Sequence, residues 1–437
     1  MNFHDRPRSV WAFPLIALAV VLLVFGSDWL GLGTGLRGLL LVAYRLWQPV
    51  PTVTAASGSR AAELAVLALA GLAVVLTAVR FGARWSLAAT IAAIGAIGAL
   101  SWHLYSVKGY FLDALGPGVG IAIAFAGAAI ARLLEIAEMR GRLRAAFGGM
   151  LAPKLIERLA RRPSLLKLGG ESRTITYLTC RLHGLSGAAP QTDAGAFADL
   201  RTRYLAPLLD AAFANEATIA QIGGDGFACF WNAPLQDSDH ARLACATALA
   251  MSNAINSVNP PCAQEEQREG CKVEAHTGID TGQAIVSGFP MQGRMIYSAA
   301  SDCASASQAM QAYATRYGYD VIAGQNTRDL AERSFAFLEI DTVMDEEGDK
   351  PVKLYALIGD QSVRCSPKFR AVTTFHDNIF QALRAQQWNR ARELIEQCRN
   401  LSGARQKLYE LHLARIAWFE QHPPGPEWDG AFRPILK

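Results

Sequence analysis

Four long apolar stretches dominate the first third of the chain, at about residues 11–25, 64–79, 85–104 and 112–133. The hydrocarbon core of a bilayer takes about 20 helical residues, and each stretch reaches that length with its aromatic or weakly polar flanks. We therefore expect a transmembrane region of four helices within residues 1–134. A buried helical bundle, or a cleaved signal peptide for the first stretch, is the alternative. Soluble cores seldom supply four such runs in so short a segment.

The distribution of arginines predicts how these helices are oriented. Basic residues precede the first stretch, separate the second from the third and follow the fourth: Arg6, Arg8, Arg80, Arg84, Arg132, Arg140, Arg142 and Arg144. Because basic loops stay in the cytosol, we expect a multi-pass protein of the inner or plasma membrane, with both termini and the soluble domain cytoplasmic. The segment 31–59 would then lie on the far side of the membrane. Arg37, Arg45 and Arg60 would lie on that side too, which is contrary to the preference of basic residues for the cytosol.

Charge adds little beyond this membrane interpretation. Charged residues make up 18% of the chain and apolar residues 51%, and the formal net charge is +4 over 437 residues. Much of the positive charge lies beside the apolar stretches, where it suits anionic membrane lipid. Nothing in the composition calls for a nucleic-acid partner.

Periodicity beyond the last apolar stretch predicts a mixed α and β domain. Residues 133–159 have apolar positions at helical spacing, with a break at Gly148-Gly149 and Pro153. Strands are expected at 173–180, 218–222 and 227–231, as a pair around 273–289, and at 321–322; helices are expected at 196–215, 239–256 and 302–317. The order βαββαβ is that of a ferredoxin-like palm, so the fold class is α+β.

Several motifs in this part resemble the class III adenylyl and guanylyl cyclases in their bacterial membrane-bound form. They are Ala145 to Leu159, Gly169-Gly170-Glu171, the hairpin Gly223-Gly224-Asp225-Gly226, Trp231 to Pro234, and Thr277 to Gly288. The tail adds Trp388, Tyr409 to Arg415, Pro423-Pro424 and Trp428-Asp429-Gly430, which resemble the ending of cyclases with an extracellular CHASE-type sensor. Only about 35 residues occupy the place of that sensor, so we expect it to be lost or reduced.

The resemblance covers roughly residues 143–437 and implies an organisation. A transducing helix and linker would span 135–168, a cyclase homology domain 169–360 and a C-terminal helical tail 361–437. It also implies a homodimer, or a heterodimer with another class III cyclase, and ATP or GTP as the nucleotide. The hairpin resembles the GGDEF hairpin of diguanylate cyclases as well, but the acidic fourth position of that motif is Gly226 here.

The chemistry implied by the resemblance is incomplete in this chain. Closing a nucleoside triphosphate into a cyclic monophosphate requires a 3′ oxygen aimed at the α-phosphorus, and the family uses two Mg or Mn ions held by two aspartates. Asp225 keeps one metal position, and Arg181 stands at the other. The positions of the partner subunit's transition-state asparagine and arginine are Ser305 and Ala309.

The nucleotide-binding positions are also altered. The purine-selecting positions are occupied by Gln221 and Ser298, while Gly223 and Gly224 could approach a phosphate. Turn geometry alone is the competing explanation for the glycines of the hairpin. Two strand histidines, His183 and His276, are expected to be structural hydrogen-bonding residues, and Asp302 a helix N-cap.

The expected loss of rate from the replaced catalytic residues favours a degenerate cyclase. Removing one preorganised charge-stabilising group typically costs about 10²- to 10³-fold in rate, so several losses together leave little activity even when they are not additive. The sequence therefore predicts a dimerising or regulatory pseudo-cyclase without a metal cofactor. The alternatives are a residual adenylate cyclase that converts ATP to cyclic AMP and diphosphate with Mg or Mn, and a membrane structural protein that reuses the fold.

Opposite charges at the two metal positions suggest a direct ion pair. If the Arg181 guanidinium reaches across adjacent strands to Asp225, it replaces the metal ions with an internal cation and holds the hairpin closed without ligand. The alternative is an arginine that points to solvent on a relaxed surface.

Overall fold

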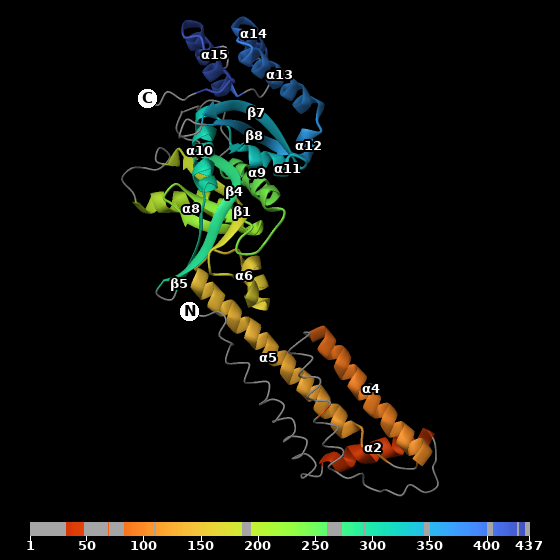
Figure 1. The fold of residues 1–437 in the computed structure, drawn as a ribbon. Helices are drawn as coiled ribbons and strands as arrows, with labels where there is room; N and C mark the ends of the chain where they lie inside the picture. Colours follow the sequence, from red (N-terminus) through yellow and green to blue (C-terminus); the bar gives the residue numbers. More distant parts are fainter. Residues whose placement is uncertain are drawn as a thin grey trace. The chain divides into compact units, whose positions relative to one another are not determined.

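The computed structural model describes ten stretches of the chain: residues 32–47, 69, 83–108, 111–185, 194–259, 273–291, 294–344, 350–399, 405–425 and 428–432. They divide into two compact units, one ending at Arg142 and one beginning at Leu143 (Figure 1). The boundary falls within helix α5, Leu115–Phe147. The finer division of the soluble part at 168 and 360 stays a prediction.

The first unit contains helices α2, Leu32–Trp47, and α4, Ala83–Lys108, together with most of α5. Among the described residues, Trp85–Val107 and Leu115–Phe147 are long and apolar enough to cross a membrane, by length and composition. The expected stretches 11–25 and 64–79 lie outside the described residues, except for Leu69. A region of four transmembrane helices therefore stays a prediction.

Helix α5 is bounded by local signals that the sequence makes visible. Asp113 Oδ1 accepts a hydrogen bond from the Leu115 backbone N–H at 3.0 Å, which satisfies one of the free donors of the first turn. The helix ends where Gly148 and Gly149 take φ values of +50° and +85°, a conformation that glycine adopts without strain. Helix α6, Pro153–Arg161, then starts with proline in its first turn. The predicted break at Gly148-Gly149 and Pro153 is confirmed.

The second unit is built on one mixed sheet, and its first half has the predicted order of elements. These are β1 (Glu171–His183), α8 (Ala194–Ala214), β2 (Thr218–Ile222), β3 (Gly226–Trp231), α9 (His240–Val258) and β4 (Glu274–Met291). The strands lie in the order β2-β3-β1-β4, and each neighbouring pair is antiparallel. This is the split βαβ arrangement of ferredoxin-like folds, so the α+β prediction is confirmed.

The second half of the unit extends the sheet and adds a helical tail. Its elements are β5 (Arg294–Ala300), α10 (Asp302–Tyr317), β6 (Val321–Ala323), α11 (Gln325–Ala331), β7 (Phe335–Met344), β8 (Pro351–Asp360), α12 (Gln361–Arg364), α13 (Pro367–Arg384), α14 (Trp388–Arg399) and α15 (Gln406–Gln421). Strand β6 lies parallel to β4, and β8 and β7 continue the sheet beyond it.

The expected pair of strands around 273–289 is wrong. One 18-residue strand, β4, fills this stretch, and its hairpin partner is β5, which the sequence analysis missed. Two glycines within this strand, Gly278 and Gly282, allow close contacts with α10. A Cβ on Gly278 would lie 2.0 Å from the Ser307 carbonyl oxygen of α10, and one on Gly282 would lie 3.1 Å from Cys303 Cβ. These glycines let α10 pack directly on the strand.

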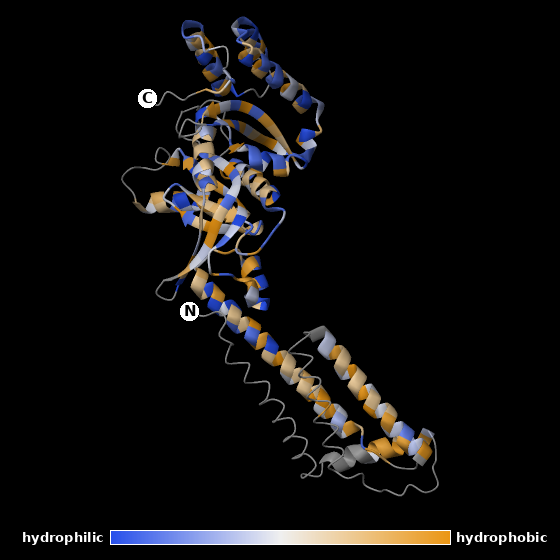
Figure 2. Ribbon diagram, viewed as in Figure 1, coloured by the Kyte–Doolittle hydropathy of each residue, from blue (hydrophilic) through white to orange (hydrophobic). Residues whose placement is uncertain are grey.

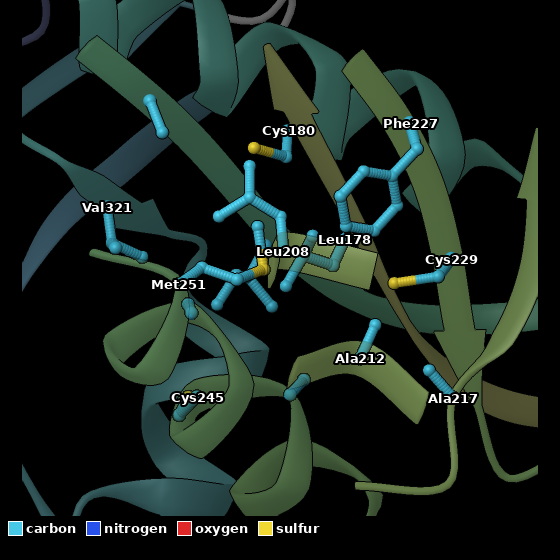
Figure 3. Packing of buried hydrophobic residues seen from close by; sticks show 14 of the residues in the cluster. Leu178, Cys180, Leu208, Ala212, Ala217, Phe227, Cys229, Cys245, Met251 and Val321 are labelled. Carbon is cyan, nitrogen blue, oxygen red and sulfur yellow. The ribbon is translucent and has the colours of Figure 1, made fainter. Parts of the chain in front are cut away.

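A hydrophobic core between the sheet and helices α8 and α9 holds the hairpin region in place (Figure 3). Side chains at alternate positions of β1 enter it, as expected for a strand with one face covered by helices: Leu178, Cys180 and Leu182. Opposite them lie Leu208 of α8 and Met251 of α9, both fully buried. Burying a side chain of this size contributes about 1.5–3 kcal/mol.

A second core joins the helical tail to β6, β7, β8 and α10. At its edge lies a buried polar network in which Arg415 of α15 binds the carboxylate of Asp341 on β7, with exposed side-chain fractions of only 9% and 5%. Tyr317 at the end of α10 donates to the same carboxylate and accepts from Arg415 Nη2 at 3.0 Å. The guanidinium also lies 3.9 Å from the ring centroid of Phe432. Burial raises the pKa of the Tyr317 hydroxyl well above its usual range.

This network generates a stability prediction. Substituting Arg415→Leu leaves the Asp341 carboxylate buried without its cation, and breaking a buried pair in this way costs about 3–5 kcal/mol. The urea midpoint of the full chain in detergent, followed by tryptophan fluorescence, should fall accordingly. The double variant Asp341→Leu/Arg415→Leu removes both charges and should regain part of the loss. An unchanged midpoint for Arg415→Leu would contradict the assignment.

Candidate functional site

The hairpin between β2 and β3 is held against the end of β1 by backbone hydrogen bonds. The Gly223 N–H donates to the Gly226 carbonyl at 2.8 Å and closes the turn. The Leu182 N–H of β1 donates to the Asp225 carbonyl at 2.6 Å. Because β3 pairs with β1 in antiparallel register, Gly226 lies opposite Arg181. The turn therefore brings the side chains of Arg181 and Asp225 together.

The two side chains form an ion pair, which decides between the two alternatives that the sequence left open. Nε and Nη2 of Arg181 each lie 2.9 Å from Oδ2 of Asp225. The side chains are 53% and 48% exposed, and an ion pair with this exposure contributes only about 0–1 kcal/mol to stability. Its importance is chemical, because the carboxylate at the tip of the hairpin is already hydrogen-bonded to a cation.

The glycines of the hairpin differ in the space that surrounds them. A Cβ on Gly226 would lie 2.1 Å from the Cys180 carbonyl oxygen, so the close approach of β1 requires glycine at this position. A Cβ on Gly224 would have no heavy atom within 4 Å. Neither Gly223 nor Gly224 has a left-handed φ. A left-handed conformation therefore does not explain these two glycines, and the open space at Gly224 leaves room for a ligand.

One residue that supports the turn was missed from the sequence. Arg201 of α8 donates from Nη2 to the Gly223 carbonyl at 2.7 Å. Its Nε is buried and has no hydrogen-bond partner among the described residues. No sequence signal connects a helical arginine to a turn that lies 22 positions away. Arg201 adds positive charge close to the hairpin.

The remaining predicted site residues lie on other elements. Gln221 is exposed on β2 opposite Ala228, and Ser298 is half-buried on β5 opposite Ser287. On α10, Ser305 is exposed and Ala309 half-buried. Within the described part of the chain, no hydrogen bond or ion pair joins any of these four predicted residues to Asp225. The structure thus gathers Arg181 and Asp225 and leaves the other four predicted residues outside that pair.

The two strand histidines, His183 and His276, are both hydrogen-bonded. His276 Nδ1 donates to the Tyr319 carbonyl at 2.8 Å, and His183 Nε2 lies 3.2 Å from the Thr315 hydroxyl, so both are hydrogen-bonded strand histidines as expected. Burial, then the neighbouring His276 and Arg181, lower the pKa of His183.

The N-cap of α10 is Ser301, one residue before the expected Asp302. Ser301 caps the helix by accepting from the Cys303 N–H at 2.9 Å, and Asp302 lies in the first turn.

A further titratable group, Asp280, was also missed. It lies on β4 opposite Tyr177, and burial raises the pKa of its carboxyl to about 7. Within the described ranges, no group of three or more His, Cys, Asp or Glu side chains could hold a metal ion. At the hairpin the donor set is one carboxylate bound to a guanidinium, which does not fit a pair of magnesium ions.

Comparisons with known proteins agree with the resemblance. No family model matches the chain. Adenylate cyclase 1 of Rhizobium meliloti (strain 1021) is 28% identical over 148 residues, which is 33% of this chain and 22% of that protein. The match thus spans about a fifth of that relative's length.

Solved structures of cyclases show weaker similarity. The guanylyl cyclase Cya2 is 22% identical with a TM-score of 0.38, covering 44% of this chain and 95% of that one. The adenylyl cyclase CyaB from P. aeruginosa is 18% identical with a TM-score of 0.38, covering 44% and 96%. A bacterial light-regulated adenylyl cyclase is 11% identical with a TM-score of 0.40, covering 56% and 68%. The sequence match to adenylate cyclase 1 is consistent with the resemblance to class III cyclases.

The close approach at the hairpin generates a prediction with a matched control. Gly226→Ala forces a Cβ against backbone of β1 and should cost about 1–3 kcal/mol in the free energy of unfolding. Gly224→Ala meets open space in the same turn and should stay within about 0.5 kcal/mol of the wild type. Urea unfolding of both variants measures the difference. Equal effects of the two substitutions would show that the strand contact is not what requires glycine.

Proposed function

We propose, from the relation to class III cyclases, that this chain is a membrane-anchored cyclase homologue that acts through dimerisation in cyclic-nucleotide signalling and does not itself close the nucleotide ring. The observation that carries the proposal is the ion pair between Arg181 and Asp225. Its guanidinium lies where a metal-using site would need a second carboxylate.

An arginine at position 181 opposes metal binding at Asp225 by electrostatic repulsion. A divalent cation about 5 Å from a guanidinium is repelled by about 2 kcal/mol in bulk water and about 7 kcal/mol at an effective dielectric constant of 20. The half-exposed pair lies between these limits. A metal ion at Asp225 would therefore have to displace its hydrogen-bonded partner and tolerate the repulsion, with only one carboxylate as compensation.

The second half of a composite site is also weakened. If α10 supplies residues to a partner subunit, as the family resemblance implies, the relevant positions hold Ser305 and Ala309. Neither side chain carries a charge, so neither can stabilise the negative charge that develops on the phosphates. The described residues of the unit nevertheless form an eight-stranded sheet and two hydrophobic cores. A folded domain without this chemistry supports a role as homodimer, or as regulatory partner of an active class III cyclase.

The membrane anchor is part of the proposal. Helices α4 and α5 have the length and composition of membrane spans. Arg84 lies at the start of α4, and Arg140, Arg142 and Arg144 lie at the end of α5. Since basic residues favour the cytosolic side, this pattern supports a cytoplasmic domain and a short connection between the two helices on the far side.

Residual adenylate cyclase activity is the second candidate. The similarity to adenylate cyclase 1 over 148 residues favours it, as does the retention of Asp225 at the tip of an intact hairpin. In that case the enzyme would convert ATP to cyclic AMP and diphosphate. ATP and GTP are the nucleotides to test, each with Mg and with Mn.

The full chain in nanodiscs should form no cyclic nucleotide from ATP or GTP above the level of an Asp225→Ala variant, with either metal. A triple variant, Arg181→Asp/Ser305→Asn/Ala309→Arg, restores the missing groups and should raise the product at least about 10²-fold, because each group is worth about that much in related active sites. The matched control is the same triple variant with Asp225→Ala added. Wild-type product that disappears in Asp225→Ala would overturn the proposal in favour of the residual cyclase.

A further inference from the structure

Helix α2 is too short to cross a membrane. It has 16 residues, Leu32–Trp47, and therefore spans about 24 Å at 1.5 Å per residue. The hydrocarbon core is about 30 Å thick. The helix also carries Arg37 and Arg45, and it has no acidic residue in its first turn. As described, the helix is shorter than a membrane span, and the question is what its apolar residues contact.

One face of α2 packs against α4 and the chain just before α5 through a cluster of aromatic rings. The Tyr44 ring lies 5.1 Å from that of Trp102 and 5.2 Å from that of Tyr105 on α4, and 6.2 Å from that of Phe111 just before α5. Its hydroxyl donates to Ser101 Oγ at 3.3 Å. These contacts place α2 at the end of α4 and the beginning of α5 (Figure 1).

The same contacts indicate the depth of α2. Tyrosine and tryptophan gather at the boundary between hydrocarbon and headgroups, where an apolar ring with a polar end is favoured. The cluster lies at the end of α4 that is remote from Arg84. If α4 and α5 cross the membrane, this end is the far-side boundary, and α2 lies at the level of that boundary.

The opposite face of α2 is apolar and exposed. Leu39, Val42 and Leu46 are spaced for one side of a helix, and their exposed fractions are 68%, 56% and 79%. Trp47 is 86% exposed, and Arg45 is exposed at the edge of this stripe. A helix face turned to water is normally polar. Exposed apolar side chains also lie on α4 and α5, which Figure 2 shows as largely hydrophobic. They include Ile91, Val107 and Ile130, with exposed fractions of 63%, 65% and 58%.

We infer that α2 lies in the plane of the membrane at the far-side interface, with Leu39, Val42 and Leu46 in the acyl-chain boundary and Arg45 among the lipid phosphates. The partner of this surface is phospholipid. Exposed apolar side chains on α2, and on α4 and α5 beside it, argue for lipid over water, and the length of α2 as described argues for an in-plane position. The inference rests on the proposed membrane anchoring.

A functional consequence follows from this placement. Because Tyr44 links α2 to α4 and to the chain entering α5, a change in the lipid boundary that moves α2 acts directly on the helix that continues into the soluble unit. In this proposal the far-side part of the chain responds to changes in the lipid bilayer. Such a response does not need a folded domain that binds a soluble ligand.

The depth of α2 can be measured by fluorescence. The full chain, with its exposed Cys365 and the two cysteines at 262 and 271 replaced by serine, would carry a single environment-sensitive nitrobenzoxadiazole label at Leu46→Cys. Nanodiscs would contain phospholipid with a doxyl quencher either near the headgroup or deep in the acyl chain. The matched control places the label at Arg45→Cys, one residue away on the edge of the stripe.

We expect the label at 46 to emit as in an apolar environment and to be quenched at least about twofold more strongly by the shallow than by the deep doxyl group, with weaker quenching at 45. Strongest quenching by the deep group would mean that α2 enters the core, and no quenching by either would mean that water or another protein segment covers the stripe. Either result overturns the inference. Carbonate extraction of the same sample tests the anchoring separately: an extracted protein refutes the membrane anchor, whereas a retained protein without quenching refutes only the role of α2.

Discussion

The pairing of β1 with β3 is the constraint on which the candidate site depends. The two strands approach so closely at Gly226 that no side chain fits between it and the Cys180 carbonyl. The same register places position 181 beside the tip of the hairpin. A long side chain at position 181 is therefore within reach of Asp225. In this chain Arg181 occupies the position and forms an ion pair with Asp225.

The strength of this ion pair and its effect on chemistry are different matters. Half-exposed partners gain little stability from each other, and the fold depends instead on the two hydrophobic cores and on the buried Arg415, Asp341 and Tyr317 network. We propose that the pair nevertheless disfavours a metal ion at the hairpin, because its guanidinium repels a divalent cation at short range. A contact that adds little stability would then change the chemistry of the site while leaving the scaffold intact.

Much of the fold could be predicted from the sequence, because local signals specify it. Alternating apolar residues marked β1, and the glycines around Asp225 marked the hairpin. The sequence placed Arg181 on the neighbouring strand but left two alternatives, an ion pair with Asp225 and an arginine that points to solvent, and only the structure decides for the ion pair. By contrast, β5 was missed because glycines in β4 look like turn residues, although they serve close contact with α10. Arg201 and Asp280 escaped detection since only the tertiary fold brings Arg201 to the turn and buries Asp280.

We propose that a guanidinium takes the place of metal at this hairpin. Manganese binding to the full chain, measured by electron paramagnetic resonance, tests it directly, with Asp225→Asn and Arg181→Asp as the compared variants. The account predicts that the wild type and Asp225→Asn bind manganese equally, and that Arg181→Asp gains a site that is lost again when Asp225→Asn is added. Manganese binding by the wild type that disappears in Asp225→Asn would contradict the account.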